Sequence, residues 1–446
     1  MNKKSTFKWL AITLLLGICV FSYAMLTKIQ NQQKIPPQSS SSVDAKDETP
    51  VKKPDENLPK PPENIYNVLP RNANIINEML VQNIGGADRE TLRAVHNLGN
   101  YAYVIFDTVS NSFDIKSTKK SVAIAQLDGY LKLVSLLVLS GSTDETFSSS
   151  KVTSDGILIA TSGEKYTKIY QISYALEAIN QIQFESSNAS YMYLDKLGTY
   201  LFMSQDKKLS AKLLSNTLDV KSTSSVELDN PKLLEVFPSA NGFTLYVNGA
   251  DYYGNLEFSN NGGFVSQNIH RDKQINSIYP CDNDGQLGFI ALCNNKNSFS
   301  LLKLDKNLNI ITSKSIGRFE VCFMYPVGEN FFVYTSGDSI KTMLFCKHLD
   351  KVMQTNEGIV ISTISNFSNK DGYLTINAHT PDNELYILQT QGGKFEVMQK
   401  LSASASYTTI DASGALYFSS ALKQGIFINN FGNYDIFIAR KTNLEK

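Results

Sequence analysis

The chain has 446 residues, enough for one large domain or two to three ordinary ones, and its 42 basic side chains equal its 42 acidic ones. A net charge of zero excludes the usual nucleic-acid-binding protein, which needs surplus positive charge to replace the counterions of the phosphates. With 4 scattered histidines and no histidine pair at a metal-binding spacing, the chain also carries no sign of a metal site.

The first element in the chain is a hydrophobic run. Three lysines among residues 1–8 precede an uncharged stretch from Trp9 to Leu26. As a helix, residues 9–26 would span roughly 27 Å at about 1.5 Å per residue, just enough for a thin bilayer, and the lysines favour a cytoplasmic N-terminus. We therefore expect residues 1–8 to be a cytoplasmic tail and residues 9–26 to be a single transmembrane helix, which is an uncleaved signal anchor.

A cleaved signal peptide is the alternative for this run. Ser22-Tyr23-Ala24 resembles the small-x-small sequence before a cleavage site, and cleavage there would release a protein that begins at Met25. Either interpretation places the rest of the chain outside the cytoplasm. The expected location is therefore the cell membrane, with a single pass and an extracytoplasmic domain, or the exterior after cleavage.

Residues 27–72 have the composition of a disordered linker. Eight of the 13 prolines lie between Pro36 and Pro70, and lysine, glutamate, aspartate and serine fill much of the rest. Such a segment buries too little apolar surface to offset the entropy lost on ordering. We expect a solvated spacer between the membrane segment and a folded domain over residues 73–446.

Beyond the linker, glycines recur at turns that precede short apolar strands. They are Gly99, Gly156, Gly198, Gly242, Gly285, Gly328, Gly372 and Gly414, and every interval except the first is 42–44 residues. Residues 168–184 also align without gaps on residues 300–316, three periods away, and both segments have the pattern of a strand, a turn and a strand. A four-stranded unit of this length, recurring about eight times, predicts an all-β fold, namely a β-propeller of about eight four-stranded blades, with seven blades as the alternative.

The two ends of the repeat region predict how the ring closes. Residues 434–440 have the pattern of the third strand of the last unit, and residues 74–81 match residues 309–316, the fourth strand of another unit. We expect residues 74–81 to pair with residues 434–440, so that an N-terminal strand completes the last blade. A short helix over residues 74–81 is the alternative.

Two of the units carry a recognisable sequence pattern. The second unit reads GSTDETFSSSKVTSDGILIATSG (residues 141–163), and the last ends in GNYDIFIARK (residues 432–441). The chain resembles the bacterial cell-surface β-propeller repeat proteins, whose units have the patterns G-S-x-x-E-x-F, T-x-D-G-x-I-x-A-x-G and D-x-F-I-A-K. It departs from these patterns at Leu158, Ser162 and Arg440. The resemblance covers most of residues 74–441, although the units at 186–228 and 318–356 have drifted far from the pattern. It implies a propeller fold and no particular activity.

One interval is irregular, because the first exceeds the others by about 13 residues. The extra length falls at residues 110–121, between the second and third strands of the first blade, on a face where insertions often bind ligands. We expect Phe113 to be an apolar anchor there, and Lys116, Lys119 and Lys120 to attract an acidic partner such as an anionic envelope polymer. A tolerated surface insertion without a function is the alternative.

The remaining motifs give no indication of catalysis. The folded region has no tryptophan, no histidine–glutamate metal motif, no G-x-S-x-G nucleophile and no phosphate-binding loop. We therefore expect no catalytic residues, metal or cofactor, and a noncatalytic binding module of the bacterial cell envelope whose partner is an envelope protein or glycan. A hydrolase or lyase that acts on an envelope glycan, and a structural accessory subunit of a membrane assembly, are the alternatives.

Four cysteines lie in the folded region, at positions 281, 293, 322 and 346. In an exported domain they would suffice for two disulfides, whereas buried free thiols would act as small apolar side chains. We favour free thiols because a domain of this size does not need covalent cross-links.

Overall fold

Antiparallel hairpins account for all the regular secondary structure of the described residues. The computed structural model describes residues 74–441 apart from residues 77–78, 86–87, 110–119, 140–143, 186–189, 196–197, 206, 240, 272, 284, 297, 338–339, 357, 371–372, 383, 392–393, 402–404, 411–415 and 421–434. The tail, membrane segment and linker predicted at residues 1–72 lie outside the described residues. Within the described residues, no helix combines the length and the hydropathy that crossing a bilayer requires.

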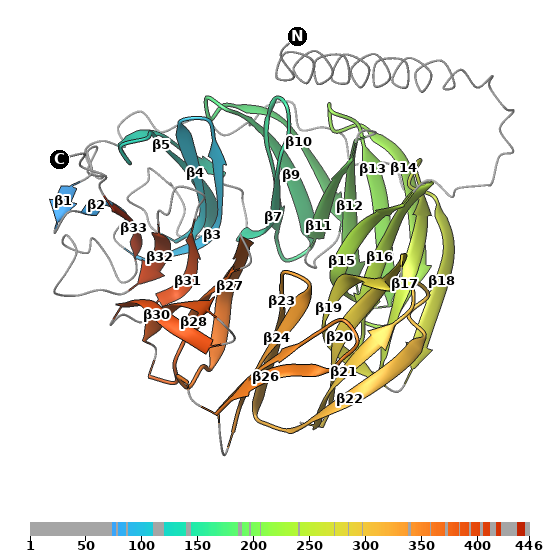
Figure 1. The fold of residues 1–446 in the computed structure, drawn as a ribbon. Helices are drawn as coiled ribbons and strands as arrows, with labels where there is room; N and C mark the ends of the chain where they lie inside the picture. Colours follow the sequence, from blue (N-terminus) through green and yellow to red (C-terminus); the bar gives the residue numbers. More distant parts are fainter. Residues whose placement is uncertain are drawn as a thin grey trace, which may run out of the picture. The chain divides into compact units, whose positions relative to one another are not determined.

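The described strands assemble into eight antiparallel sheets, which we number in chain order (Figure 1). Sheet 1 contains β3 (Glu90–Leu98), β4 (Tyr101–Thr108), β5 (Ser121–Leu127) and β6 (Leu133–Leu139). Sheet 2 contains β7 (Thr146–Val152), β8 (Gly156–Ser162), β9 (Tyr166–Ser173) and β10 (Ala178–Glu185). Sheet 3 contains β11 (Ser190–Asp195), β12 (Gly198–Gln205), β13 (Lys208–Leu214) and β14 (Val220–Glu227). Sheet 4 contains β15 (Lys232–Ser239), β16 (Gly242–Asn248), β17 (Tyr252–Ser259) and β18 (Phe264–Arg271).

The second half of the ring repeats this arrangement. Sheet 5 contains β19 (Gln274–Asn283), β20 (Gln286–Asn295), β21 (Ser298–Leu304) and β22 (Ile310–Arg318). Sheet 6 contains β23 (Val321–Val327), β24 (Asn330–Ser336), β25 (Lys341–Phe345) and β26 (Lys351–Thr355). Sheet 7 contains β27 (Thr363–Lys370), β28 (Tyr373–His379), β29 (Leu385–Gln391) and β30 (Lys394–Leu401). Sheet 8 contains β31 (Ala405–Ile410), β32 (Leu416–Ser420), β33 (Asp435–Lys441), β2 (Met79–Ile84) and β1 (Asn74–Ile76).

Apolar clusters join each sheet to the next around the ring. Side chains of a middle strand alternate between the two neighbouring sheets, so that Tyr246 of β16 packs with sheet 5, whereas Leu245 and Val247 pack with sheet 3. Seven such clusters are present among the described residues, one between sheets 8 and 1 and one at each junction from sheets 1–2 to sheets 6–7. First strands of successive sheets contact one another, for example β3 with β7 and β27 with β31, so the first strand of each sheet is the innermost (Figure 1).

Sheet 8 closes the ring with a strand from the N-terminal end of the domain, as predicted. The pairing of β2 with β33 runs from Met79 opposite Lys441 to Ile84 opposite Ile436. The predicted boundaries were wrong, because residues 74–81 belong to two strands, and β1 lies beside β2 as a fifth strand at the edge. The closing strand occupies residues 79–84 because this register buries Ile84 beside Ile436 in the cluster shared with sheet 1.

A recurrent turn connects the third and fourth strands of five sheets. It ends in a leucine with left-handed backbone conformation, at Leu131, Leu176, Leu218, Leu308 and Leu349 (φ 57–64°). This conformation costs a leucine roughly 1–2 kcal/mol. Each of these side chains is at most 3% exposed, and burial of a leucine contributes about 1.5–3 kcal/mol. Burial therefore offsets the strain at a position where glycine is usual.

A β-bulge lies near the start of the fourth strand in sheets 1 to 6, just after the turn from the third strand. The extra residue is Val134, Ile179, Lys221, Val265, Ile311 and Val352, respectively. All but the lysine are exposed apolar side chains. Because the fourth strand is the outer edge of its sheet, the bulge interrupts an edge that would otherwise invite pairing with another chain.

Close backbone approach explains two of the periodic glycines. In sheets 2 and 4, the second strand begins at Gly156 and Gly242, and an added Cβ would lie 1.9 Å from the Ile172 carbonyl oxygen and 1.8 Å from that of Phe258. Any larger residue would push the second and third strands apart, so glycine recurs where the second strand starts.

The four cysteines of the ring are free thiols, as expected. Cys293 and Cys322 are buried within the apolar clusters of the sheet 4–5 and sheet 5–6 junctions. Burial raises the pKa of the Cys322 thiol to about 12, which keeps it protonated and unreactive at neutral pH.

Candidate functional site: the base of the inserted loop

The predicted insertion lies between β4 and β5 of sheet 1, as the sequence indicates. Of the four residues predicted to bind a partner, Phe113, Lys116 and Lys119 lie outside the described residues. Lys120 is the one that can be placed. The part of the site that the structure describes is therefore the base of the loop, where sheet 1 meets sheet 2.

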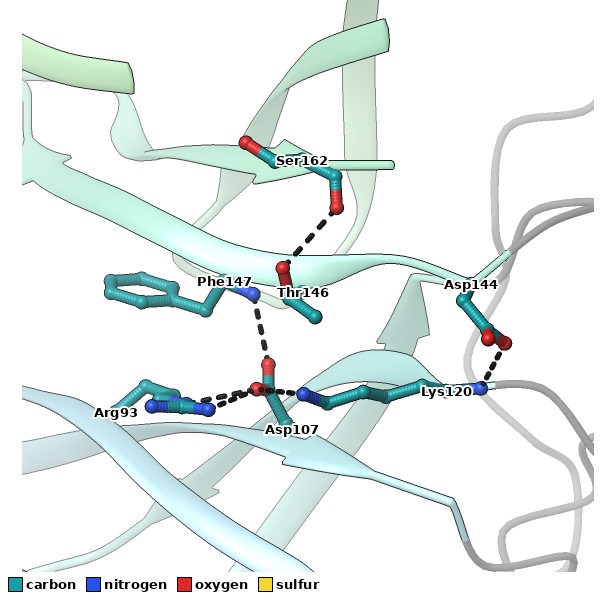
Figure 2. A network of polar contacts seen from close by, with 7 residues as sticks. All are labelled: Arg93, Asp107, Lys120, Asp144, Thr146, Phe147 and Ser162. Carbon is teal, nitrogen blue, oxygen red and sulfur yellow. Dashed lines mark hydrogen bonds and ion pairs between the residues drawn. The ribbon is translucent and has the colours of Figure 1, made fainter. Parts of the chain in front are cut away.

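Asp107, near the end of β4, is a buried carboxylate at the centre of a cluster of charges at this base (Figure 2). Its side chain is 1% exposed, and its Oδ2 atom lies 2.8 Å from Arg93 Nε, 2.7 Å from Arg93 Nη2 and 3.1 Å from Lys120 Nζ. The other carboxylate oxygen accepts a hydrogen bond of 2.9 Å from the backbone N–H of Phe147 in β7. Asp107 thus links β3, the end of the inserted loop and sheet 2.

The position of Arg93 depends on a bulge in β3. Leu92 pairs with Phe106 and Ala94 pairs with Ile105, so Arg93 is the extra residue between them. A bulge turns the side chain of its extra residue away from the regular alternation of the strand. The guanidinium group can therefore reach Asp107 on the neighbouring strand.

Backbone hydrogen bonds anchor both ends of the inserted loop. At the far end, the N–H of Lys120 donates to Asp144 Oδ1 at 2.9 Å, and its carbonyl accepts from the Glu145 N–H at 2.9 Å. At the near end, the Val109 N–H donates to the Arg89 carbonyl at 3.3 Å. Lys120 therefore has an anchoring role that the sequence did not indicate, while its contact with a partner stays a prediction, like those of the other three residues.

A second buried carboxylate, Glu145, lies beside this cluster in the segment that leads into β7. It is fully buried, and it accepts hydrogen bonds from Lys168 Nζ at 2.6 Å, Thr161 Oγ1 at 2.9 Å, Tyr170 OH at 3.0 Å and Tyr166 OH at 3.2 Å. All four donors belong to β8 and β9 of sheet 2. Glu145 is the glutamate of the G-S-x-x-E-x-F pattern, so this motif residue has a role in joining the strands of its own sheet.

The chemistry of the two carboxylates is that of an anchor. All the hydrogen-bond and ion-pair partners described for Asp107 and Glu145 come from the chain itself. Burial raises the pKa of Tyr170 well above its ordinary value of 10.0, and the negative charge of Glu145 raises it further, so this hydroxyl remains a donor. Charge-assisted hydrogen bonds of this kind are stronger than neutral ones and fix the geometry of both partners.

A second candidate region runs along the inner strands of sheets 1 to 6. His96 Nε2 of β3 lies 2.7 Å from Ser150 Oγ of β7, and Lys151 Nζ lies 5.4 Å from the centre of the Tyr191 ring of β11. Burial lowers the pKa of His96, and the charge of Lys151 lowers it further. Contacts between inner strands therefore continue from one sheet to the next.

Tyrosines and one glutamate extend this inner region. Burial raises the pKa of Tyr191, and the charge of Glu235 in β15 raises it further. Burial likewise raises the pKa of Tyr279, with Tyr325 and then Glu235 adding to it. The rings of Tyr279 and Tyr325 have their centres 6.5 Å apart. The charge of Glu235, an exposed residue of sheet 4, thus raises the pKa of tyrosines on both neighbouring sheets.

No described contact of this inner region joins His96 to Glu235. Hydrolases and lyases need a convergent acid and base, often two carboxylates, and these two residues lie on sheet 1 and sheet 4. Within the described ranges, no group of three histidine, cysteine, aspartate or glutamate side chains is placed to hold a metal ion.

Comparison with known proteins identifies the fold. The chain matches no protein-family model and no curated protein sequence. The Dos1 propeller superposes with a TM-score of 0.53 at 10% identity, over 84% of this chain and 96% of that one. Sqt1 from Saccharomyces cerevisiae superposes with a TM-score of 0.52 at 8% identity, over 82% of this chain and 98% of that one. The fold is a β-propeller.

A third similar structure limits what this likeness implies about the propeller. The dihydro-heme d1 dehydrogenase NirN, in complex with DHE, has a TM-score of 0.50 at 14% identity and covers 77% of this chain and 78% of that one. Proteins this distant share an architecture and do not transfer an activity. The comparisons therefore show the propeller class, and the more specific resemblance to bacterial surface repeats has no matching family model.

The carboxylates of this site were not predicted from the sequence. Asp107 directly follows the apolar run YVIF (residues 103–106) within a strand, and Glu145 lies in the G-S-x-x-E-x-F motif, to which no role was assigned. A charged residue inside an apolar strand is rarely buried unless it is paired. That rule marks Asp107 as a residue with a partner, although it does not reveal that the partners are Arg93 and Lys120.

Proposed function

We infer that this propeller is a noncatalytic interaction module, tethered to the outer face of a cell membrane by residues 9–26 and by the linker at residues 27–72. The lysines before the hydrophobic run and the proline-rich composition of the linker support the tether. The resemblance to bacterial surface repeats supports an envelope location. The proposed partner is an acidic protein or polymer of the envelope, bound by the face that carries the inserted loop.

The observation that carries this proposal is the anchored base of the loop. The loop that breaks the period is held at both ends, and its anchor is a buried carboxylate whose desolvation is costly unless it is paired. Lengthening a loop costs only a few tenths of a kcal/mol, roughly, so an insertion without a function would not require such an anchor. Because Lys120 pairs with Asp107, Lys116 and Lys119 carry the positive charge offered to the partner.

Partner capture from native membranes tests the proposed binding face. The full-length protein is compared with a variant in which a short Gly-Ser turn replaces residues 110–119 and leaves Asp107 and Lys120 in place. We expect the variant to lose capture at an unchanged melting temperature. A second variant has serine in place of Lys116 and Lys119, so that it loses the charge of the loop but keeps its length. This variant should weaken capture more at low salt than at high salt. Equal capture by all three proteins would contradict the proposal.

Membrane fractionation tests the tether separately. We expect the full-length protein to stay with membranes after a high-salt wash, and a version that begins at residue 30 to be soluble. N-terminal sequencing of the mature protein is the second measurement. A mature chain that begins at Met25 would show that residues 9–24 belong to a cleaved signal peptide and not to an anchor. That result would not bear on the proposed binding face.

A further inference from the structure

A groove of about 700 Å³ lies at the junction of sheets 1 and 2, at the opposite ends of the strands from the inserted loop. One wall comes from Tyr101 at the start of β4, and another from Val134 and Ser135 of the outer strand β6. The third wall is the turn of sheet 2 at residues 174–175. The volume is within the range of about 300–1,000 Å³ that small-ligand sites occupy.

The floor of the groove is a row of polar side chains across sheet 1. Tyr103 pairs with Gln126, and Gln126 pairs with Ser135, so these side chains share one face of the sheet. Tyr103 OH donates to the Tyr174 carbonyl at 2.8 Å, and Gln126 Nε2 donates to Tyr103 OH and to the same carbonyl at 3.1 Å each. The Tyr174 hydroxyl donates in turn to the Thr153 carbonyl. These bonds hold the aromatic rings in place before any ligand arrives.

The hydrogen bonds described around the groove differ from those at the next three junctions. At those junctions, a side chain of the outer strand donates a hydrogen bond to a turn carbonyl of the following sheet: Asn180 to Thr217, Ser222 to Asn261 and Asn268 to Asn307. Inner tyrosines also bond to turn carbonyls, Tyr200 to Asn260 and Tyr253 to Leu308. At the junction of sheets 1 and 2, the described donors to the turn are the inner side chains of Tyr103 and Gln126, and the outer-strand residues Val134 and Ser135 line the groove.

The chemistry of the walls selects an uncharged ligand. None of the nine residues that line the groove is charged, and a charged ligand would lose hydration there without gaining a partner. Tyr101 is 42% exposed and presents an aromatic surface to the groove. Aromatic faces beside amide and hydroxyl groups suit a ligand that has both apolar C–H surfaces and hydroxyls.

We propose that this groove binds a neutral sugar ring of a glycan. The C–H face of the ring stacks on Tyr101. Its hydroxyls donate to Gln126 Oε1, because the amide nitrogen of Gln126 already donates to Tyr103 and Tyr174, and they form hydrogen bonds with the Ser135 hydroxyl. A folded protein partner would need about 800 Å² of surface on each side for a stable complex, far more than these nine residues offer. This site lies away from the inserted loop, and it does not rest on the function proposed for that loop.

Saturation-transfer NMR on the full-length protein tests the proposal. The protein is held in a detergent without a sugar headgroup, because a glycosidic headgroup would compete for the groove. The probes are cellobiose, lactose and the disaccharide of N-acetylglucosamine, with digalacturonic acid as the anionic comparison. We expect at least one neutral disaccharide to bind, and Tyr101→Ala to reduce its affinity at least tenfold. Tyr101→Phe, which keeps the ring, should retain most of the affinity.

Two controls make the result decisive. Tyr130→Ala removes a tyrosine that is 79% exposed on the same sheet but does not line the groove, so it should bind as the wild type does. The variant without residues 110–119 should also bind normally, which separates this site from the loop. The proposal is overturned by the absence of neutral-sugar binding, by equal binding of Tyr101→Ala and the wild type, or by preference for digalacturonic acid. A proline-rich peptide that binds in place of sugars and depends on Tyr101 would likewise overturn it in favour of a protein partner.

Discussion

The junction of sheets 1 and 2 and the junction of sheets 3 and 4 occupy equivalent places in the ring but differ in chemistry. At the first, the buried carboxylates Asp107 and Glu145 engage cations and hydroxyls. At the second, the ring of Phe243 stacks on Phe258 with 5.1 Å between centroids, and it meets Tyr200 at 4.6 Å and Phe202 at 5.6 Å. Both junctions also contain an apolar cluster, so the charges at the first junction add to apolar packing and do not replace it.

The difference indicates what each junction can tolerate. An aromatic cluster depends on burial and shape, so a replacement of similar volume keeps most of its stability. A buried carboxylate depends on its partners, because removing them leaves its charge buried and unpaired. The inserted loop is attached to the junction that tolerates less change, and its ends are correspondingly well fixed.

The largest expected loss of stability comes from replacing Glu145, which accepts four hydrogen bonds in a fully buried position. Glu145→Ala leaves Lys168 and three hydroxyls without their acceptor, so we expect it to lower the free energy of unfolding by about 3–5 kcal/mol. Urea unfolding measures this loss. Glu145→Gln keeps the shape and should lose less, while Glu177→Ala, at an exposed position, should lose little. A loss from Glu145→Ala no larger than that from Glu177→Ala would remove the basis of the comparison.

Phe243→Leu tests the aromatic junction. The leucine keeps an apolar side chain but loses the ring contacts with Phe258, Tyr200 and Phe202, so we expect a loss of about 1–3 kcal/mol. The loss should be the same in low and high salt, since no charge is involved. A salt-dependent loss would show that the two junctions do not differ in the way proposed.

Much of the ring could be predicted because its strands repeat. The offset that aligns residues 168–184 with residues 300–316 also carries β9 and β10 onto β21 and β22, and it places Leu176 on Leu308, both in left-handed conformation. The leucine turn itself was not predicted, because a left-handed residue is usually expected to be glycine. Its signal, a leucine three positions after a serine, an aspartate or, at Leu349, a cysteine, becomes visible only when the units are aligned on their third strands.

Two of the units that drifted from the sequence pattern, at residues 186–228 and 318–356, also differ in structure. In sheets 3 and 6, the first and second strands pair without a shift of register. In the other six sheets, a bulge interrupts this pairing, as at Arg93 of sheet 1 and between Phe147 and Ser149 of sheet 2. Sequence drift therefore coincides with the loss of the bulge. The charged site was less predictable, because Asp107 meets residues 14, 13 and 40 positions away, and local sequence patterns do not encode such distances.

Asp107→Asn is expected to have a smaller effect than Glu145→Ala. The asparagine keeps an oxygen for the Phe147 N–H but loses the charge that pairs with Arg93 and Lys120. Because those two side chains are 36% and 33% exposed, water can solvate them after the substitution, and we expect a loss of about 1–2 kcal/mol. High salt should reduce the loss, in contrast to Phe243→Leu.

Limited proteolysis is the more specific measurement for Asp107→Asn. If Asp107 holds the loop ends, the variant should be cut within residues 110–119 faster than the wild type under native conditions. A double-mutant cycle with Lys120→Met isolates the pair, and its coupling energy should be favourable. Unchanged cleavage together with zero coupling would assign the loop's position to the backbone hydrogen bonds of Lys120 alone.

The smallest expected effect is on the pH dependence of stability, and it should come from the junction of sheets 1 and 2 and not from that of sheets 3 and 4. His96 bonds to Ser150 across the inner strands of sheets 1 and 2, and burial, followed by the charge of Lys151, lowers its pKa below 6.5. The unfolded chain therefore binds a proton at a higher pH than the folded chain does. The stability contributed by neutral His96 is present above pH 6.5 and is lost as the pH falls through the lowered pKa.

His96→Asn should remove this part of the pH dependence. The unfolding free energies of the variant and the wild type should therefore become more similar from neutral to mildly acidic pH, or the variant should become the more stable of the two. Urea unfolding at both pH values measures it, and Phe243→Leu, which alters the other junction, should leave the pH dependence as it is in the wild type. A difference between His96→Asn and the wild type that is constant across this range would mean that the histidine titrates alike in the folded and unfolded chains.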